Sequence, residues 1–400
     1  MLALIAPAHA AEWWMQPAVR AGAEYNDNIR FATGTTEKAT GYFVSPDIGF
    51  GVAEENWRVT GGANLKSVRY SSVDDLDADD YRASLNGRYN TQRNAWTVDG
   101  SSAKQSLLAS DVVDADTGLS RQDRDRRTKA LRPAWSWAAD ERTQLRTDYG
   151  YTDVRYDYDA AADLFDYRQN SGAITLLRDI TPRWQISASF GYADFQTRNP
   201  TPGTTDYTAR SETTTAQVGF THMLSETLRI GLTGGSRRTK FDQVVRCAVR
   251  LPSGVCLFPG FSTRSETDSG SVYSLDVSQD FPRSRIVFRM ARSVEPSGGG
   301  SQVESDSATV TVDHRLSERL QLTLSGQGYR HRTVGGDTTL VDRDYYSGGP
   351  RISWMLTEHW TLDSAYRYTH LKYPGGGAEA NQNIVSMTLT YRWSRWTISR

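Results

Sequence analysis

Apolar and polar residues alternate along most of this chain, in stretches of about ten residues. In residues 320–325 the leucines fall on one face of an extended strand, while Gln321, Thr323 and Ser325 fall on the other. The same alternation recurs at Trp184/Ile186/Ala188/Phe190, Leu228/Ile230/Leu232, Ile286/Phe288/Met290, Ala308/Val310/Val312 and Val385/Met387/Leu389/Tyr391/Trp393. A period of two residues predicts β-strands whose two faces meet different surroundings.

The connections between these stretches alternate between short and long. Short turns are predicted at eight places, at residues 53–56, 91–94, 139–142, 181–183, 225–227, 281–284, 317–319 and 357–359. Longer segments rich in Asp, Gly, Ser and Pro occur at nine places, around residues 26–40, 71–79, 109–125, 158–165, 199–206, 242–265, 295–303, 332–340 and 373–380. We therefore predict an all-β fold, a transmembrane antiparallel up-and-down β-barrel of about 18 strands (16 is the alternative), with short periplasmic turns and long extracellular loops.

The overall composition agrees with a barrel and excludes a bundle of membrane helices. Hydrophobic residues make up 38% of the 400 residues and the mean hydropathy is -0.58. No run approaches the roughly 20 apolar residues that a spanning helix needs. A barrel strand faces lipid with every second side chain, so its average hydropathy stays low. The formal net charge of -1 gives no basis for binding nucleic acid.

Aromatic residues cluster near the connections. Seven tryptophans lie close to a short turn: Trp57, Trp96, Trp135, Trp137, Trp184, Trp354 and Trp360. Ten tyrosines lie near the long loops: Tyr25, Tyr70, Tyr81, Tyr151, Tyr156, Tyr192, Tyr207, Tyr329, Tyr368 and Tyr373. Because these rings prefer the membrane–water interface, the pattern predicts one aromatic girdle at each rim. The alternative is a soluble β-sandwich with the same aromatics in its core.

The first residues have the composition of a secretory signal. An apolar stretch ends in the small-x-small site Ala8-His9-Ala10, so we interpret residues 1–11 as the remnant of a signal peptide and residues 12–400 as a single barrel domain. The alternative for residues 1–11 is an apolar first strand. Export to an oxidising compartment also favours a local disulfide between Cys247 and Cys256.

The sequence contains no recognisable catalytic or metal-binding motif. The six histidines show no metal-ligand spacing, so no metal site or cofactor is predicted. His331 and His370 near the outer side could serve an outer-membrane hydrolase, but a structural or solvent-facing role is the simpler interpretation. The acidic segment 74–80 could hold calcium, although it lacks the glycine and terminal Glu of an EF-hand loop, and a hydrated loop is the simpler interpretation. We predict that the chain is not an enzyme.

The residues that alternate with the apolar set should face the lumen, and many are basic. They are Arg58, Lys66, Arg82, Arg88, Arg132, Arg146, Arg229, Arg237, Arg289, Arg367 and Arg392. The acids that alternate with the apolar set in the same way are Asp99, Asp148, Asp276, Asp313 and Asp363. Inward bases therefore exceed inward acids about two to one. This excess predicts an anion path. The alternative is that the arginines pair with the aspartates and rigidify the wall.

Three stretches resemble the β-barrel porin family associated with exopolysaccharide export, the EpsL-type proteins. They are RAGAEYNDN at residues 20–28, SPDIGF at 45–50 and MTLTYRW at 387–393. One departure is the segment 394–400, because barrel-assembly signals usually end at the terminal aromatic residue. Either Trp393 ends the signal, or the last strand extends to about Ile398.

The resemblance implies an outer-membrane channel that passes an acidic exopolysaccharide to the cell surface. The partners it implies are outer-membrane lipid and lipopolysaccharide, the polysaccharide itself, and periplasmic polysaccharide-export or co-polymerase proteins. A general or substrate-specific diffusion porin for small solutes is the alternative, and an outer-membrane hydrolase is the third hypothesis. In a porin of that kind, the loop at 242–265 would be the longest candidate for a constriction.

Overall fold

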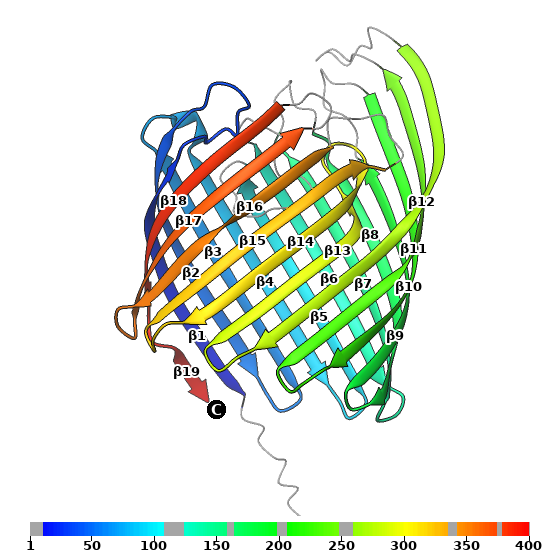
Figure 1. The fold of residues 1–400 in the computed structure, drawn as a ribbon, viewed down its shortest axis with the longest axis horizontal. Coiled ribbons are helices and arrows are strands. Elements are labelled where there is room, and N and C mark those ends of the chain that lie inside the picture. Colours follow the sequence, from blue (N-terminus) through cyan, green and yellow to red (C-terminus); the bar gives the residue numbers. More distant parts are fainter. Residues whose placement is uncertain are drawn as a thin grey trace, which may run out of the picture.

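The computed structural model describes residues 11–107, 124–157, 164–197, 206–247, 259–334, 342–373 and 378–399. Nearly all of them lie in strands of one continuous sheet (Figure 1). The interpretation of residues 1–11 as a signal remnant falls, apart from Ala11, outside the described residues. No helix in the described part of the chain is long and apolar enough to cross a membrane.

The sheet contains nineteen strands in chain order. They are β1 (Glu12–Asn26), β2 (Ala39–Ala53), β3 (Trp57–Tyr70), β4 (Ala78–Asn90), β5 (Asn94–Ser106), β6 (Asp125–Ala138), β7 (Thr143–Tyr156), β8 (Tyr167–Thr181), β9 (Trp184–Thr197), β10 (Asp206–Met223), β11 (Leu228–Cys247), β12 (Pro259–Asp280), β13 (Ser284–Pro296), β14 (Gln302–Arg315), β15 (Leu320–Thr333), β16 (Arg343–Met355), β17 (Trp360–Tyr373), β18 (Ala378–Arg392) and β19 (Trp396–Ser399). A short 3-10 helix, η1 (Asp74–Leu76), lies between β3 and β4.

From β1 to β18 each strand pairs antiparallel with its neighbours in sequence, and β1 closes the barrel. One edge of β1 pairs with β2, while the other pairs with β18 and then with β19. Because β18 and β19 follow one another along that edge, the nineteen strands fill eighteen places in the wall. The predicted barrel of eighteen strands is confirmed, and after three residues outside any strand its last strand continues past Trp393 to Ser399.

The connections follow the predicted alternation, with one correction. Eight short turns lie at one end of the barrel, the end near both termini of the described chain, and nine longer connections lie at the other (Figure 1). The predicted loop at 242–265 is wrong at both of its ends. β11 runs on to Cys247 and β12 begins at Pro259, and Asp242 pairs with Ser265. The sequences of these strand ends, 242–247 and 259–265, lack a regular apolar alternation, so the pattern that reveals the other strands is missing.

The outward face is apolar and rimmed with tryptophan. Exposed apolar side chains occupy alternate positions, such as Tyr81 and Leu85 on β4. Near the short turns, Trp96, Trp137, Trp184, Trp354 and Trp360 are exposed on this face, as expected for the periplasmic girdle.

The predicted tyrosine girdle is only partly correct. Tyr25, Tyr81, Tyr192 and Tyr368 are exposed on the outward face, but Tyr70, Tyr156 and Tyr329 are buried inside the barrel. They point inward because loops and strand ends pack there into small apolar clusters, and Tyr70 joins Ile29, Val68, Val73 and Leu76 in one of them. A position near a long loop therefore does not reveal which side of the wall a tyrosine faces.

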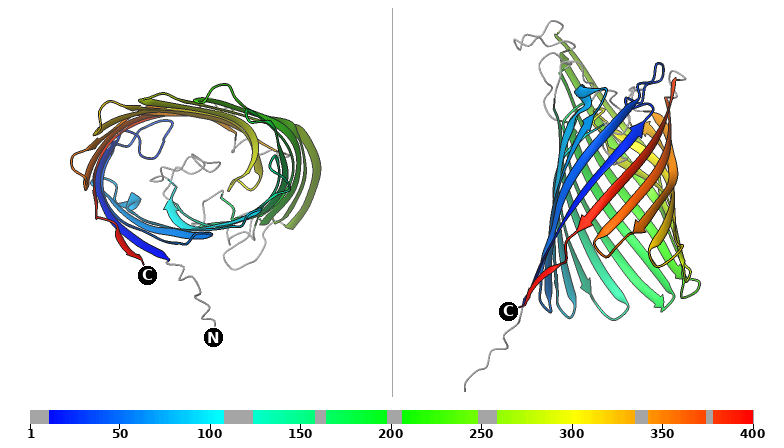
Figure 2. Two further views of the ribbon diagram at one scale, coloured as in Figure 1. Left: turned by 90° about the horizontal axis from the view of Figure 1, so that it is seen from below. Right: turned by 90° about the vertical axis from the view of Figure 1, so that its left-hand side faces the viewer.

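The backbone pairing between β12 and β13 covers only part of β12. These strands pair between Tyr273/Arg292 and Asp280/Arg285, although β12 begins at Pro259. Beyond Arg292 the end of the β13–β14 hairpin turns into the barrel, where the hydroxyls of Ser211 and Thr213 on β10 donate to Gln302 Oε1 over 2.8 and 3.0 Å. Figure 2, viewed from below, shows this yellow end inside an oval cross-section. We call residues 293–305 the inward hairpin end.

Candidate functional site

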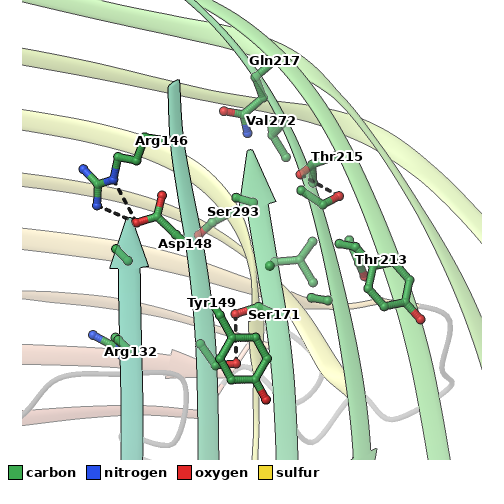
Figure 3. Close-up of a pocket in the computed structure, with 18 of the residues that line it drawn as sticks. Arg132, Arg146, Asp148, Tyr149, Ser171, Thr213, Thr215, Gln217, Val272 and Ser293 are labelled. Carbon is green, nitrogen blue, oxygen red and sulfur yellow. Dashed lines mark hydrogen bonds and ion pairs between the residues drawn. The ribbon is translucent and has the colours of Figure 1, made fainter. Parts of the chain in front are cut away.

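The inward face of the wall is the candidate site. All eleven basic residues selected from the sequence occupy register positions opposite to the outward apolar set. On β3, for example, Arg58 and Lys66 alternate with Trp57 and the exposed Leu65, and on β4 Arg82 and Arg88 alternate with Tyr81, Leu85 and Tyr89. Arg132 on β6 and Arg146 on β7 line the pocket drawn in Figure 3.

Three of the eleven are held in ion pairs along the wall. Arg146 Nη2 lies 2.6 Å from Asp148 Oδ1, and Arg289 Nε lies 3.3 Å from Asp276 Oδ1. Arg237 is almost completely buried and lies 2.7 Å from both Asp268 and Glu304. The pairs of Arg289 and Arg237 join different strands, as the alternative interpretation predicted, whereas Arg146 and Asp148 lie on the same strand, β7.

Several of the other inward bases have no carboxylate partner within the described residues, although Arg367 is not one of them. Arg58, Arg82, Arg132, Arg229 and Arg392 make neither a side-chain hydrogen bond nor an ion pair there. Arg88 donates to the amide oxygen of Asn90 over 3.0 Å, and the Lys66 ammonium lies over the Phe43 ring. Arg367 lines the largest interior cavity described below.

The five inward aspartates differ from these arginines, because each has a partner in the wall, through a hydrogen bond or, for Asp276, an ion pair. Arg146 and Arg289 bind Asp148 and Asp276. The remaining three accept from neutral donors: Asn86 binds Asp99, Thr323 binds Asp313, and Ser353 binds Asp363. The inward surface therefore presents guanidinium donors without protein partners beside carboxylates that already have donors.

The sequence missed several inward charges. Arg20, Arg285 and Arg351 face inward, as do Glu24, Asp47 and Asp80. Arg20 lies 3.2 Å from Asp47, whereas Arg351 has no partner in the described part of the chain. The additional acids reduce the predicted two-to-one excess of bases. Arg20 and Arg351 were hard to find because small residues surround them, as in Ala18-Val-Arg-Ala-Gly22 and Gly348-Gly-Pro-Arg351, so the alternation is weak.

Three cavities lie along this inward surface. One of about 480 Å³ lies between β5–β10 and the inward hairpin end, and includes Arg132, Thr213 and Gln302 (Figure 3). A second, of about 420 Å³, includes Arg20, Lys66, Arg82 and Arg351. The third, of about 800 Å³, adjoins the second and is lined mainly by hydroxyl and amide side chains of β14–β18. The described interior is thus polar and not filled by side chains.

The other predicted site residues add no catalytic arrangement. His331 is buried, accepts or donates a hydrogen bond with Ser305, and stacks on Tyr329. His370 bonds Asn381 on the outward side. Among the residues that the structure describes, no group of three or more His, Cys, Asp and Glu side chains could hold a metal ion. The pairing of Cys247 with Cys256 lies outside the described residues, since Cys256 and the Cys247 side chain are not described.

The acidic segment 74–80 contacts neighbouring protein groups, while the side chains of Asp75 and Asp79 stay mostly exposed to water, as a hydrated loop predicts. Asp75 forms an ion pair with Arg30, Asp77 accepts from the backbone N–H of Tyr70, and Asp79 accepts from Ser67. The hydrogen bonds that Arg30 donates to the carboxylates of Asp75 and Glu37 raise the pKa of its guanidinium. These contacts tie the β1–β2 and β3–β4 loops together.

Comparison with known proteins identifies the architecture. The ferric citrate transporter FecA, in its unliganded form, matches with a TM-score of 0.52 at 8% identity, over 94% of this chain and 78% of FecA. The open form of the ferric-catecholate import receptor Fiu from E. coli K12 matches with a TM-score of 0.50 at 10% identity, over 94% of this chain and 81% of Fiu. The fold is that of the outer-membrane β-barrels. No protein-family model and no curated protein sequence matches the chain, so the EpsL-type resemblance stays a prediction.

Proposed function

We propose that this chain is an outer-membrane channel that conducts anionic solutes, with an acidic exopolysaccharide as its substrate. The observation that carries the proposal is the contrast between the inward arginines without partners and the inward aspartates with donors. A guanidinium group forms a planar fork that matches carboxylate or phosphate. Guanidinium groups that face the interior without a protein partner favour transient binding of carboxylate or phosphate groups while a solute passes through the barrel.

The placement of Arg58 gives independent support. It lies directly opposite Arg88 on the neighbouring strand, and both side chains face inward near the short turns. Like charges at this spacing destabilise a sheet. An arrangement that costs stability in the wall is consistent with a binding role for an anion entering from the periplasmic end.

The size and chemistry of the interior support a sugar polymer. Barrels of sixteen to eighteen strands are wide enough for an aqueous channel. Serine, threonine and glutamine side chains line much of two interior cavities, and they can exchange hydrogen bonds with sugar hydroxyls. On this proposal the chain receives its polysaccharide from periplasmic export or co-polymerase proteins, and lies among outer-membrane lipids and lipopolysaccharide.

A diffusion porin for small solutes is the second candidate, and the inward hairpin end favours it. This segment reaches the inner surface of β10 through Gln302 and occupies part of the cross-section. Such a constriction would limit the size of the solutes that pass.

Transport from proteoliposomes separates the two candidates. The purified chain should release fluorescently labelled oligogalacturonates of increasing length, and should release labelled dextran oligomers of the same lengths more slowly. Release of small labelled sugars alone, with longer acidic oligomers retained, would favour the porin. Equal release of acidic and neutral oligomers would contradict the role of the arginines.

A further inference from the structure

We propose that the barrel contains a saturable binding site for an acidic oligosaccharide, at the narrow end of the oval where β18 and β1 meet (Figure 2). The site consists of the cavity lined by Lys66, Arg82 and Arg351, and the larger cavity beside it. This inference rests on the proposed function and deepens it, because a site of this kind selects its substrate instead of only attracting anions.

The basic part of the site draws side chains from distant strands. Lys66 lies on β3, Arg82 on β4 and Arg351 on β16, and all line one cavity of about 420 Å³. Arg82 and Arg351 have no protein partner in the described part of the chain, and Lys66 contacts the ring of Phe43. Two free guanidinium forks and one ammonium group therefore point into one small space.

The two acids that line this space, Asp80 and Asp363, and Asp47 beside it do not neutralise the two arginines directly. Arg20 pairs with Asp47, Asp80 accepts the backbone N–H of Ser106 over 2.8 Å, and Asp363 accepts the hydroxyl of Ser353. The lining has four basic residues, Arg20, Lys66, Arg82 and Arg351, and two acids, Asp80 and Asp363; when Asp47, the partner of Arg20, is also counted, one positive charge remains. The unused donors belong to Arg82 and Arg351, so a carboxylate, sulfate or phosphate group of the substrate would bind between them.

The neighbouring cavity supplies the contacts for the rest of the sugar chain. The two cavities share Phe43, Lys66, Arg351 and Thr388, so they are continuous. The second holds about 800 Å³ and presents hydroxyl or amide groups from β14 to β18, including Thr311, Thr323, Gln327, Ser347 and Ser386. Hydroxyl and amide groups can both donate and accept hydrogen bonds, as sugar hydroxyls do, whereas a small inorganic anion mainly accepts them, so this lining suits sugar residues.

Binding measurements on the full-length protein in detergent test the site. Tetragalacturonate should bind saturably, as measured by isothermal titration calorimetry, and maltotetraose should bind far more weakly. The double variant Arg82→Gln/Arg351→Gln should bind tetragalacturonate at least roughly ten-fold more weakly, since each loses charge-assisted hydrogen bonds. Arg82→Lys/Arg351→Lys should be intermediate, because charge remains while the fork is lost.

The matched control is Arg146→Gln/Arg289→Gln, which removes the same charge from inward arginines that are already paired. It should retain the wild-type affinity. If both glutamine double variants lose the same affinity for tetragalacturonate while the channel still prefers anions, the site is overturned. The proposed function would then remain intact. Equal affinity of the wild type for the acidic and neutral sugars would also overturn it. Absence of both binding and anion preference would overturn the site and the proposed function together.

Discussion

Arg237 on β11 and Glu304 on β14 join two strands that are not neighbours in the wall, with Arg237 Nη2 2.7 Å from Glu304 Oε2. The Arg237 side chain is 3% exposed, and it also binds Asp268 on β12. The contact exists because the inward hairpin end lies against the inner surface of β10–β12. Side chains hold this part of the barrel together where the backbone pairing between β12 and β13 has ended.

Glu304→Gln should therefore loosen the inward hairpin end without preventing barrel assembly. Loss of one hydrogen bond between charged groups costs roughly 1.5–3 kcal/mol. Ser301, which is buried at the hairpin end, can report the change as Ser301→Cys in a Cys247→Ser/Cys256→Ser background. Its rate of modification by a thiol reagent should rise in the Glu304→Gln variant. Asp268→Asn is the control, because it removes the other partner of Arg237, and it should raise the rate less.

Two adjacent residues of β10 test the assignment of the two faces. Val218 is 69% exposed on the outward face, whereas Gln217 lines the interior pocket of Figure 3. Val218→Arg should destabilise the folded barrel by about 2–4 kcal/mol if it lies near the bilayer midplane, while Gln217→Arg should be tolerated. Urea unfolding in lipid vesicles measures both. A stable Val218→Arg barrel with an unstable Gln217→Arg barrel would reverse the assignment.

The orientation of the barrel can be tested with single cysteines on intact cells. Gly34, in the long β1–β2 connection, has open space where a side chain would be, and Glu55 lies in the short β2–β3 turn. With the native cysteines replaced by serine, Gly34→Cys should react with an impermeant reagent and Glu55→Cys should react only after the outer membrane is opened. The opposite labelling would mean that the short turns face outward.

Removal of the two native cysteines should have a local effect. A disulfide between Cys247 and Cys256 would close a loop of about ten residues and stabilise it by roughly 2–3 kcal/mol in the chain-entropy model. Cys247→Ser/Cys256→Ser should therefore assemble normally, as judged by heat-modifiable mobility on gels. Free thiols in the native protein, detected by mass spectrometry, would contradict the pairing itself.

Much of the fold follows from short-range patterns in the sequence. Alternation in β10, where Val218 and Phe220 point outward, requires only that neighbouring residues of a strand point to opposite sides of the wall. The same rule places the predicted inward arginines. It could not place Arg351, because Gly348, Gly349 and Pro350 before it give no apolar alternation.

Other features depend on contacts between residues distant in sequence. The hairpin end is turned inward through Gln302, which binds Thr213 from 89 positions away. Near Gly298 the chain approaches other segments so closely that a side chain there would collide with Tyr156. The predicted constriction at 242–265 is contradicted only at its ends, which lie in β11 and β12, while residues 248–258 fall outside the described residues.

The ion selectivity of single channels tests the central claim most directly. Reversal potentials in a KCl gradient across a planar bilayer should show that the wild-type channel prefers chloride, with the preference weakening towards 1 M salt as the Debye length falls to about 3 Å. Replacing Arg58, Arg82, Arg132, Arg229 and Arg351 with glutamine should abolish this preference, whereas Arg146→Gln/Arg289→Gln should retain it. A wild-type channel that prefers potassium, or a preference for chloride that survives the five replacements, would contradict the proposal that unpaired inward arginines define the substrate path.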